Sequence, residues 1–206
     1  MVWVRSEYAE ELAVVSAWLM AFLPWSFSYG QPMGGRFVAL RFPFVIYENL
    51  QGFGAFNHTG FLTPFDALDR SVRAGLTGAF ADSELLTRYG SKEPGVSVKT
   101  VIDALAGTSY SDGVLAYLLW AGGLLILTVA ILLSLLMYFE TDVVERWPYD
   151  RVRTMGVLLT IAAVFYAGAT IMLYLQFPGI YVPVGPFLYF ALGYVLLTVE
   201  RTEMAG

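Results

Sequence analysis

The sequence predicts an α-helical membrane protein, in which a four-helix transmembrane bundle carries a small extracytoplasmic α+β module between the first and second spans. Of the 206 residues, 57% are hydrophobic and only 14% are charged, whereas a soluble globular chain carries about 25% Asp, Glu, Lys and Arg. Residues 30–112 are too many for a structureless connection, and they should fold. Four apolar runs contain no Asp, Glu, Lys, Arg or His: residues 12–29, 113–139, 155–177 and 184–199.

The runs at 113–139 and 155–177 are long enough to cross a membrane, since about 20 helical residues cover a hydrocarbon core about 30 Å thick. The run at 12–29 is slightly short and contains Pro24 near its outer end, where water or a neighbouring helix can satisfy the freed carbonyl. The run at 184–199 is the shortest, but Pro186 suits the first turn of a helix that can continue through Glu200 and Arg201. We therefore expect four spans.

The alternative for the first run is a cleaved signal peptide. Such a peptide begins with a positively charged region. Residues 1–11 instead hold one arginine and three glutamates. We therefore favour a retained span.

The arginines and lysines near the span ends predict that both termini are cytoplasmic. The predicted organisation is a cytoplasmic N-terminus and first span at 1–29, the extracytoplasmic module at 30–112, and three spans at 113–206 with a cytoplasmic loop at 140–154 and a cytoplasmic tail. In the cell membrane this puts five arginines inside, against Arg36, Arg41 and Lys99 near span ends outside. The five are Arg5, Arg146, Arg151, Arg153 and Arg201.

The extracytoplasmic module should combine strands and helices. Residues 36–47 are rich in β-branched and aromatic side chains, which predicts one or two strands broken at Pro43. Thr63 and Asp66 form a capping-box pattern around Pro64, which predicts the start of a helix. An apolar stripe should follow on that helix: Phe65, Leu68, Val72, Leu76 and Phe80. Two shorter helices are expected at 82–89 and 97–106, and Ser111 or Asp112 should cap the next span.

The sequence contains little that points to catalysis or to a metal, and we expect no cofactor. There is no cysteine, and His58 is the only histidine, which excludes thiolate sites and histidine pairs. A Ser-His-Asp arrangement would need His58 with Asp66, and no nucleophile-elbow glycines surround the nearby serines. A calcium site at Asp82, Glu84 and Glu93 matches no known loop pattern. The acidic net charge of -5 argues against nucleic-acid binding.

Small residues recur at helical spacing in three of the apolar runs, and we interpret these stripes as helix-packing surfaces, because small side chains let helices approach closely in lipid. They join the helices of one chain or, alternatively, face a partner such as a second copy or another membrane protein. Hydroxyls in the runs should bond to their own helix rather than to a substrate. The stripes are Ala9, Ala13, Ala17 and Ala21; Ala116, Gly123 and Ala130; and Gly156, Thr160, Ala163, Ala167 and Thr170.

The triplet Asn57-His58-Thr59 is the only Asn-x-Ser/Thr sequence in the chain. It lies in the predicted extracytoplasmic module, where Asn57 is a possible glycosylation acceptor.

Two parts of the chain resemble an uncharacterised haloarchaeal family of small multi-pass membrane proteins. The first is the opening Val2-Trp-Val-Arg-Ser-Glu-Tyr-Ala-Glu-Glu-Leu-Ala13 with Trp18 and Leu23-Pro-Trp25; the second is Phe177-Pro-Gly with Val182-Pro-Val-Gly185. The resemblance implies location and topology and no activity. A looser similarity is to claudin-type proteins, which also have four spans, a large first outer loop with strands and a short second one, although their outer-loop cysteine pair is absent here.

The expected function is that of a non-enzymatic structural or interaction protein, embedded in the lipid bilayer, whose outer module makes protein or surface contacts. Residues 37–47 and 182–185 should contribute strands to that module. Two alternatives stay open. The first is an accessory subunit of a transporter or channel, with the small residues of 155–177 facing the partner. The second is a membrane-anchored enzyme acting at the outer face through His58 or acidic residues.

Overall fold

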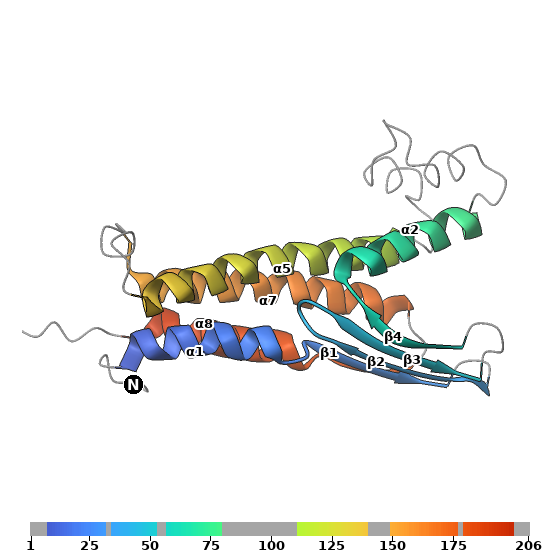
Figure 1. Ribbon diagram of the computed structural model, residues 1–206, viewed down its shortest axis with the longest axis horizontal. Helices are drawn as coiled ribbons and strands as arrows, with labels where there is room; N and C mark the ends of the chain where they lie inside the picture. Colours follow the sequence, from blue (N-terminus) through green and yellow to red (C-terminus); the bar gives the residue numbers. More distant parts are fainter. Residues whose placement is uncertain are drawn as a thin grey trace, which may run out of the picture.

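Two long helices lie side by side through most of the molecule, three shorter helices pack against them, and a sheet extends beyond their ends (Figure 1). The computed structural model describes residues 8–31, 34–52, 57–79, 111–139, 149–176 and 179–199. Within them the elements are, in chain order, α1 (Ala9–Phe22), β1 (Ser26–Gly30), β2 (Arg36–Arg41), β3 (Ile46–Gln51), β4 (His58–Leu62), α2 (Pro64–Ala79), α5 (Ser111–Tyr138), α7 (Arg151–Gln176), β5 (Ile180–Val182) and α8 (Val184–Thr198).

Helices α5 and α7 are the two described helices that are long and apolar enough to cross a membrane. They contain 28 and 26 residues, which at 1.5 Å per residue makes them about 42 and 39 Å long. Helices α1 and α8 have 14 and 15 residues and measure only about 21 and 22 Å. In Figure 1 α1 and α8 lie beside one half of the long pair, and the sheet lies beside the other half.

The predicted four-span helical bundle is therefore wrong. The run at 12–29 divides into α1, a short connection at residues 23–25 and strand β1. Buried strands lack charged residues just as membrane helices do, so the absence of charge in this run does not distinguish a strand from a helix. Pro24 lies just after the helix ends. At the other end of the chain, Val199 is already extended, so α8 stops short of Glu200.

The sheet has five antiparallel strands in the order β4-β3-β2-β1-β5. The strands expected within 36–47 are present as β2 and the start of β3, and Pro43 lies in the turn between them. Strand β5 brings a segment from beyond α7 back to β1, with Phe27 opposite Val182. Of the second stretch expected to form a strand, Val182 does so, whereas Val184 and Gly185 begin α8.

Helix α2 begins as its sequence predicts. The Thr63 Oγ1 accepts a hydrogen bond from the backbone N–H of Asp66 (3.2 Å), and the Asp66 carboxylate accepts bonds from the backbone and hydroxyl of Thr63 (3.2 and 2.7 Å). These bonds hold the pKa of Asp66 below its usual range. The predicted apolar stripe is partly wrong, because Val72 is buried but Phe65 is exposed. Phe80 and the helices expected at 82–89 and 97–106 lie outside the described residues.

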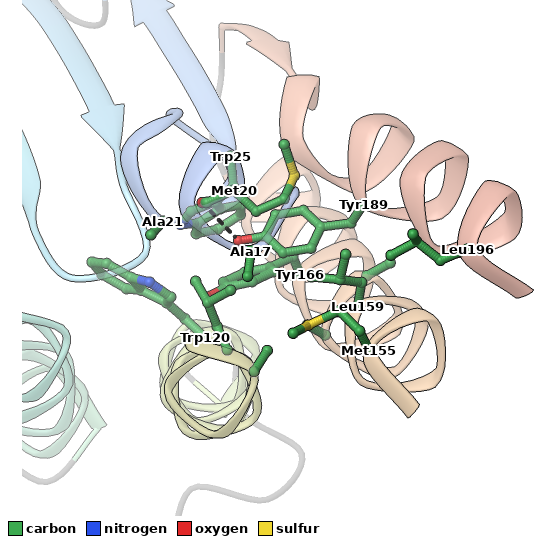
Figure 2. Packing of buried hydrophobic residues seen from close by; sticks show 14 of the residues in the cluster. Ala17, Met20, Ala21, Trp25, Trp120, Met155, Leu159, Tyr166, Tyr189 and Leu196 are labelled. Carbon is green, nitrogen blue, oxygen red and sulfur yellow. Dashed lines mark hydrogen bonds between the residues drawn. The ribbon is translucent and has the colours of Figure 1, made fainter. Parts of the chain in front are cut away.

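Four large aromatic side chains fill the place where α1 gives way to the sheet (Figure 2). Trp25, Trp120, Tyr166 and Tyr189 are all at least 99% buried. The Trp25 ring lies 5.8 Å from Trp120 and 5.3 Å from Tyr166, and Tyr166 lies 5.1 Å from Tyr189. The Tyr189 hydroxyl donates to the backbone carbonyl of Met20 (3.0 Å). This cluster joins α1, α5, α7 and α8 at the base of the sheet.

Candidate functional site

The strongest concentration of buried polar groups lies between the sheet and helix α5, and we call it the polar layer. Its buried members are Ser26, Ser28, Arg41 and Glu48, and two half-buried tyrosines, Tyr117 and Tyr181, adjoin them.

Arg41 is the central cation of the polar layer. It ends strand β2, where it faces Ser26 across the ladder, and its residue is only 3% exposed. Its guanidinium donates to the Ser28 hydroxyl (2.5 Å) and lies 5.5 Å from the centre of the Tyr181 ring. Its Nε is buried without a hydrogen-bond partner among the described residues. A buried cation is costly unless hydrogen bonds and nearby dipoles compensate it, so these partners fix the side chain in place.

Tyr181 connects the polar layer to strand β5. Its hydroxyl donates to Ser26 Oγ (2.9 Å), which ties residues far apart in the chain. Burial raises the pKa of the Tyr181 phenol, and the nearby Arg41 cation opposes that rise. The phenol therefore stays neutral, and Tyr181 stabilises the Arg41 cation through its aromatic ring and its hydroxyl dipole rather than through a negative charge.

Glu48 supplies the negative charge of the polar layer. It is 8% exposed and sits on β3 opposite Ala39, so it is diagonal to Arg41 on the same face. Its carboxylate is 3.6 Å from the guanidinium of Arg70 on α2. The sequence spacing suggests that Arg70 pairs with Asp66; the structure instead turns it towards the sheet, while Arg73 pairs with Asp69 (2.7 Å). The Glu48–Arg70 pair thus links α2 to the sheet.

The polar groups of this layer bind elements of the fold to one another. Hydroxyls, a guanidinium and a carboxylate meet there, and Trp120 adds a hydrogen bond from its indole nitrogen to the carbonyl of Pro43 (3.0 Å), joining α5 to the β2–β3 turn. In the part of the chain that the structure describes, no group of three or more His, Asp or Glu side chains could hold a metal ion. Nε2 of His58 is buried with no hydrogen-bond partner there either.

The small residues that the sequence singles out lie mostly inside the described structure. Ala9, Ala13, Ala17 and Ala21 of α1 are buried, as are the three of α5 and Gly156, Ala163 and Thr170 of α7, whereas Thr160 and Ala167 are half-buried. The contact between α7 and α8 is close, since a Cβ added at Gly193 would lie 2.4 Å from Thr160 Oγ1 and 3.1 Å from the Gly156 carbonyl. That part of the α7 stripe therefore faces α8 of the same chain. The remaining residues of the α5 stripe are Ala116, Gly123 and Ala130.

The hydroxyl groups of the long helices bond to their own backbone, as the sequence predicts. Thr128, Thr160 and Thr170 each donate to the carbonyl four residues earlier at 2.8 Å. Ser134 donates to the carbonyl three residues earlier, at 2.7 Å.

Two further predicted sites are the glycosylation acceptor Asn57 and the acidic residues considered for calcium. Asn57 is exposed just before β4, on the sheet end of the molecule. The acidic residues considered for calcium, Asp82, Glu84 and Glu93, lie outside the described residues.

A family model matches residues 2–84 and 80–201, which together cover almost the whole chain. The chain belongs to DUF7549, a family of unknown function. No curated protein and no solved structure matches it. The membership confirms the expectation of an uncharacterised family.

Sequence reasoning missed the polar layer of this DUF7549 protein. Arg41 was counted only as a charge near a span end, and Glu48 was not singled out. Strand alternation could have found them, because Arg41 is in phase with Ala39, and Glu48 with Ile46, both of which are fully buried. That inference requires knowing that these residues form strands and which face is covered.

Proposed function

We propose that the protein is an integral membrane protein whose helices α5 and α7 cross the bilayer and whose sheet end makes contacts with other proteins or surfaces. The observation that carries the membrane assignment is the exposure of the long helices. In their most apolar windows only 39% of α5 and 44% of α7 is buried inside the protein. A core helix of a soluble protein would be mostly buried, and a signal sequence would lie near the N-terminus.

Large apolar side chains point outward on α1, α5, α7 and α8, which supports the same proposal. On α1 they follow the i, i+3, i+4, i+7 pattern of one helix face, at Val15, Trp18, Leu19 and Phe22, opposite the buried alanines. In water so many exposed apolar groups would cause aggregation, whereas in lipid they are the expected surface. The others include Leu125, Val129 and Leu132 on α5, Val164, Ile171 and Leu175 on α7, and Phe187 and Tyr194 on α8.

The proposed orientation places the sheet end outside the cell. The start of α1, the end of α5, the start of α7 and the end of α8 gather at the opposite end of the molecule (Figure 1). Arg151 and Arg153 lie in the first turn of α7 at that end, and arginine beside a span favours the cytoplasmic side. Asn57 would then be extracytoplasmic and available for glycosylation.

The contrast between the uncharged long helices and the sheet end supports the contact role. The long helices carry no charged side chain between Gly113 and Phe139 or between Thr154 and Gln176, so they supply no ion pathway of their own. The sheet end has strands in a large first loop and one in a short second loop, an order compatible with the claudin-type analogy. An accessory-subunit role at the α7 stripe is the second candidate, although Ala163 is already covered by the chain itself.

Fractionation tests the membrane assignment. The protein should remain in the membrane pellet after extraction at alkaline pH, float with lipid vesicles, and dissolve only in detergent. Recovery in the alkaline supernatant would refute integral insertion. Cross-linking in native membranes followed by native mass measurement would then test the contact role, which fails if the protein is always a monomer without partners.

A further inference from the structure

The outward face of the sheet changes from apolar to polar along the strands. The row nearest the helices contains Phe27, Leu40, Tyr47, Phe61 and Val182, which lie opposite one another across all five strands. We call it the base row. The outward row two residues further along is mixed, and the last outward pair, at the tip of β2 and β3, is Arg36 and Gln51, both exposed. The mixed row is Tyr29, Val38, Asn49, Thr59 and Ile180.

The base row is exposed even though it is apolar. Phe61 is 70% and Val182 41% exposed at the two edges, and the three residues between them are half-buried. The Tyr47 and Phe61 rings lie 5.3 Å apart and form one surface. No described element covers this face, because α5 and α2 contact the sheet through the polar layer on its other side.

The lengths of α1 and α8 indicate what covers the base row. At about 21 and 22 Å, both fall short of a hydrocarbon core about 30 Å thick by roughly 8 Å. Val182 lies two residues before the first residue of α8. Phe27 lies two residues after Trp25, whose carbonyl accepts a hydrogen bond from Gly185 in the first turn of α8. Two strand residues advance about 7 Å. The base row therefore adds about 7 Å of apolar surface beyond α1 and α8, which is close to the roughly 8 Å by which these helices fall short of the hydrocarbon thickness.

The opposite ends of the short helices support the same depth. Glu10 and Glu11 in the first turn of α1 line a hollow with Met137 and Tyr138 at the end of α5. Carboxylates there mark the polar boundary on that side. The additional apolar surface that α1 needs to match the hydrocarbon thickness must therefore come from the sheet end of the molecule.

We propose that the base row of the sheet contacts lipid, at the boundary between hydrocarbon and headgroups in the leaflet on the sheet side. This inference rests on the proposed membrane insertion and adds the part of the sheet that the bilayer reaches. Tyr47 suits that boundary, where Tyr and Trp are enriched, and the other four members of the base row are apolar. Water reaches this depth, so the outer edges of β4 and β5 are not stranded in dry lipid, and Arg36 and Gln51 stand in water about 14 Å further out.

The test uses single cysteines, which need no background removal because the chain has none. Nitroxide labels are placed by Phe61→Cys and Val182→Cys in the base row, Gln51→Cys at the tip and Val129→Cys on the exposed face of α5. The protein is reconstituted in phosphatidylcholine vesicles, and label accessibility is measured to oxygen, which concentrates in lipid, and to a water-soluble nickel chelate.

The label at Val129 should favour oxygen most strongly and the label at Gln51 should favour nickel, whereas labels at Phe61 and Val182 are expected to lie between them and to favour oxygen clearly more than the label at Gln51. If Val129 favours oxygen while the two base-row labels behave like Gln51, the inference is overturned and membrane insertion stands. Base-row labels shielded from both reagents would reveal a second protein copy on this face and would also overturn it. If Val129 itself favours nickel, the proposed membrane insertion has failed.

Discussion

Substitution of Gly185 by alanine should loosen the joint between α8 and the start of the sheet. A Cβ at this position would lie 2.4 Å from Cα, 2.5 Å from Cβ and 3.1 Å from the carbonyl oxygen of Trp25. The backbone N–H of Gly185 also donates to that carbonyl (2.8 Å). Because two of the three atoms belong to the backbone of a fully buried residue, no side-chain rotation can relieve the overlap.

The expected cost combines two effects. Overpacking a well-packed site costs about 1–3 kcal/mol, and a weakened hydrogen bond about 0.5–1.5 kcal/mol. The free energy of unfolding should therefore fall by about 1.5–4.5 kcal/mol, which for a chain of this size lowers the Tm by roughly 3–18 °C.

The matched control is Gly168→Ala on α7. Its Cβ would meet only the end of the Leu119 side chain, at 3.1 Å, which can move aside. Alanine also favours a helix over glycine by up to about 1 kcal/mol, so this variant should melt at or above the wild-type temperature. Thermal unfolding in detergent, followed by circular dichroism and tryptophan fluorescence, compares the two. A Gly185→Ala variant that melts with the wild type would refute the packing of α8 on Trp25.

Three further substitutions test the polar layer and the start of α2. Arg41→Lys should lower the free energy of unfolding by about 1–2 kcal/mol, because lysine cannot reproduce both the bond to Ser28 and the contact with the Tyr181 ring, while Arg36→Lys at the exposed tip should have little effect in the same denaturation assay; equal effects would contradict the buried role. Trp120→Phe should cost about 1–3 kcal/mol by leaving the buried Pro43 carbonyl without its partner, and an unchanged melting curve would argue against that bond. Thr63→Ala should cost about 1 kcal/mol and raise the pKa of the capping carboxylate in an NMR titration. Because the pKa of Asp66 is lowered in the folded state, its carboxylate stabilises the wild type above pH 3.8, the ordinary pKa, and that stabilisation is lost as the pH falls. The variant should therefore lose less stability on acidification than the wild type. The backbone N–H of residue 63 still donates to Asp66 in the variant, so an unmoved pKa would exclude the Thr63 hydroxyl bond as the cause of the shift.

The sequence was most informative where hydropathy and length agreed. The runs at 113–139 and 155–177 lie almost wholly within α5 and α7, and Thr63 with Pro64 marked the start of α2 to the residue. The run at 12–29 misled because Ser26–Gly30 is as free of charge as the helix before it. Its alternation of Ser, Phe, Ser and Tyr is a strand pattern that only the pairing with β2 makes evident.

The candidate site was beyond the reach of composition and spacing. Arg41, Glu48 and Tyr181 come from three strands, and Tyr181 is more than a hundred residues from the other two. Their meeting depends on β5 pairing with β1 and on α5 covering one face of the sheet. A sequence pattern can assign each residue to a face of its own strand, but only the tertiary structure determines which face becomes the interior.

The orientation of the molecule across the membrane tests the account most directly. Gln51→Cys, at the tip of the sheet, and Tyr149→Cys, just before α7, are both exposed positions at opposite ends of the molecule. A membrane-impermeant maleimide is added to intact cells and, separately, to lysed ones. The account predicts that Gln51→Cys is labelled in intact cells and Tyr149→Cys only after lysis. Equal labelling of both positions in intact cells, or protection of Gln51→Cys until lysis, would contradict it.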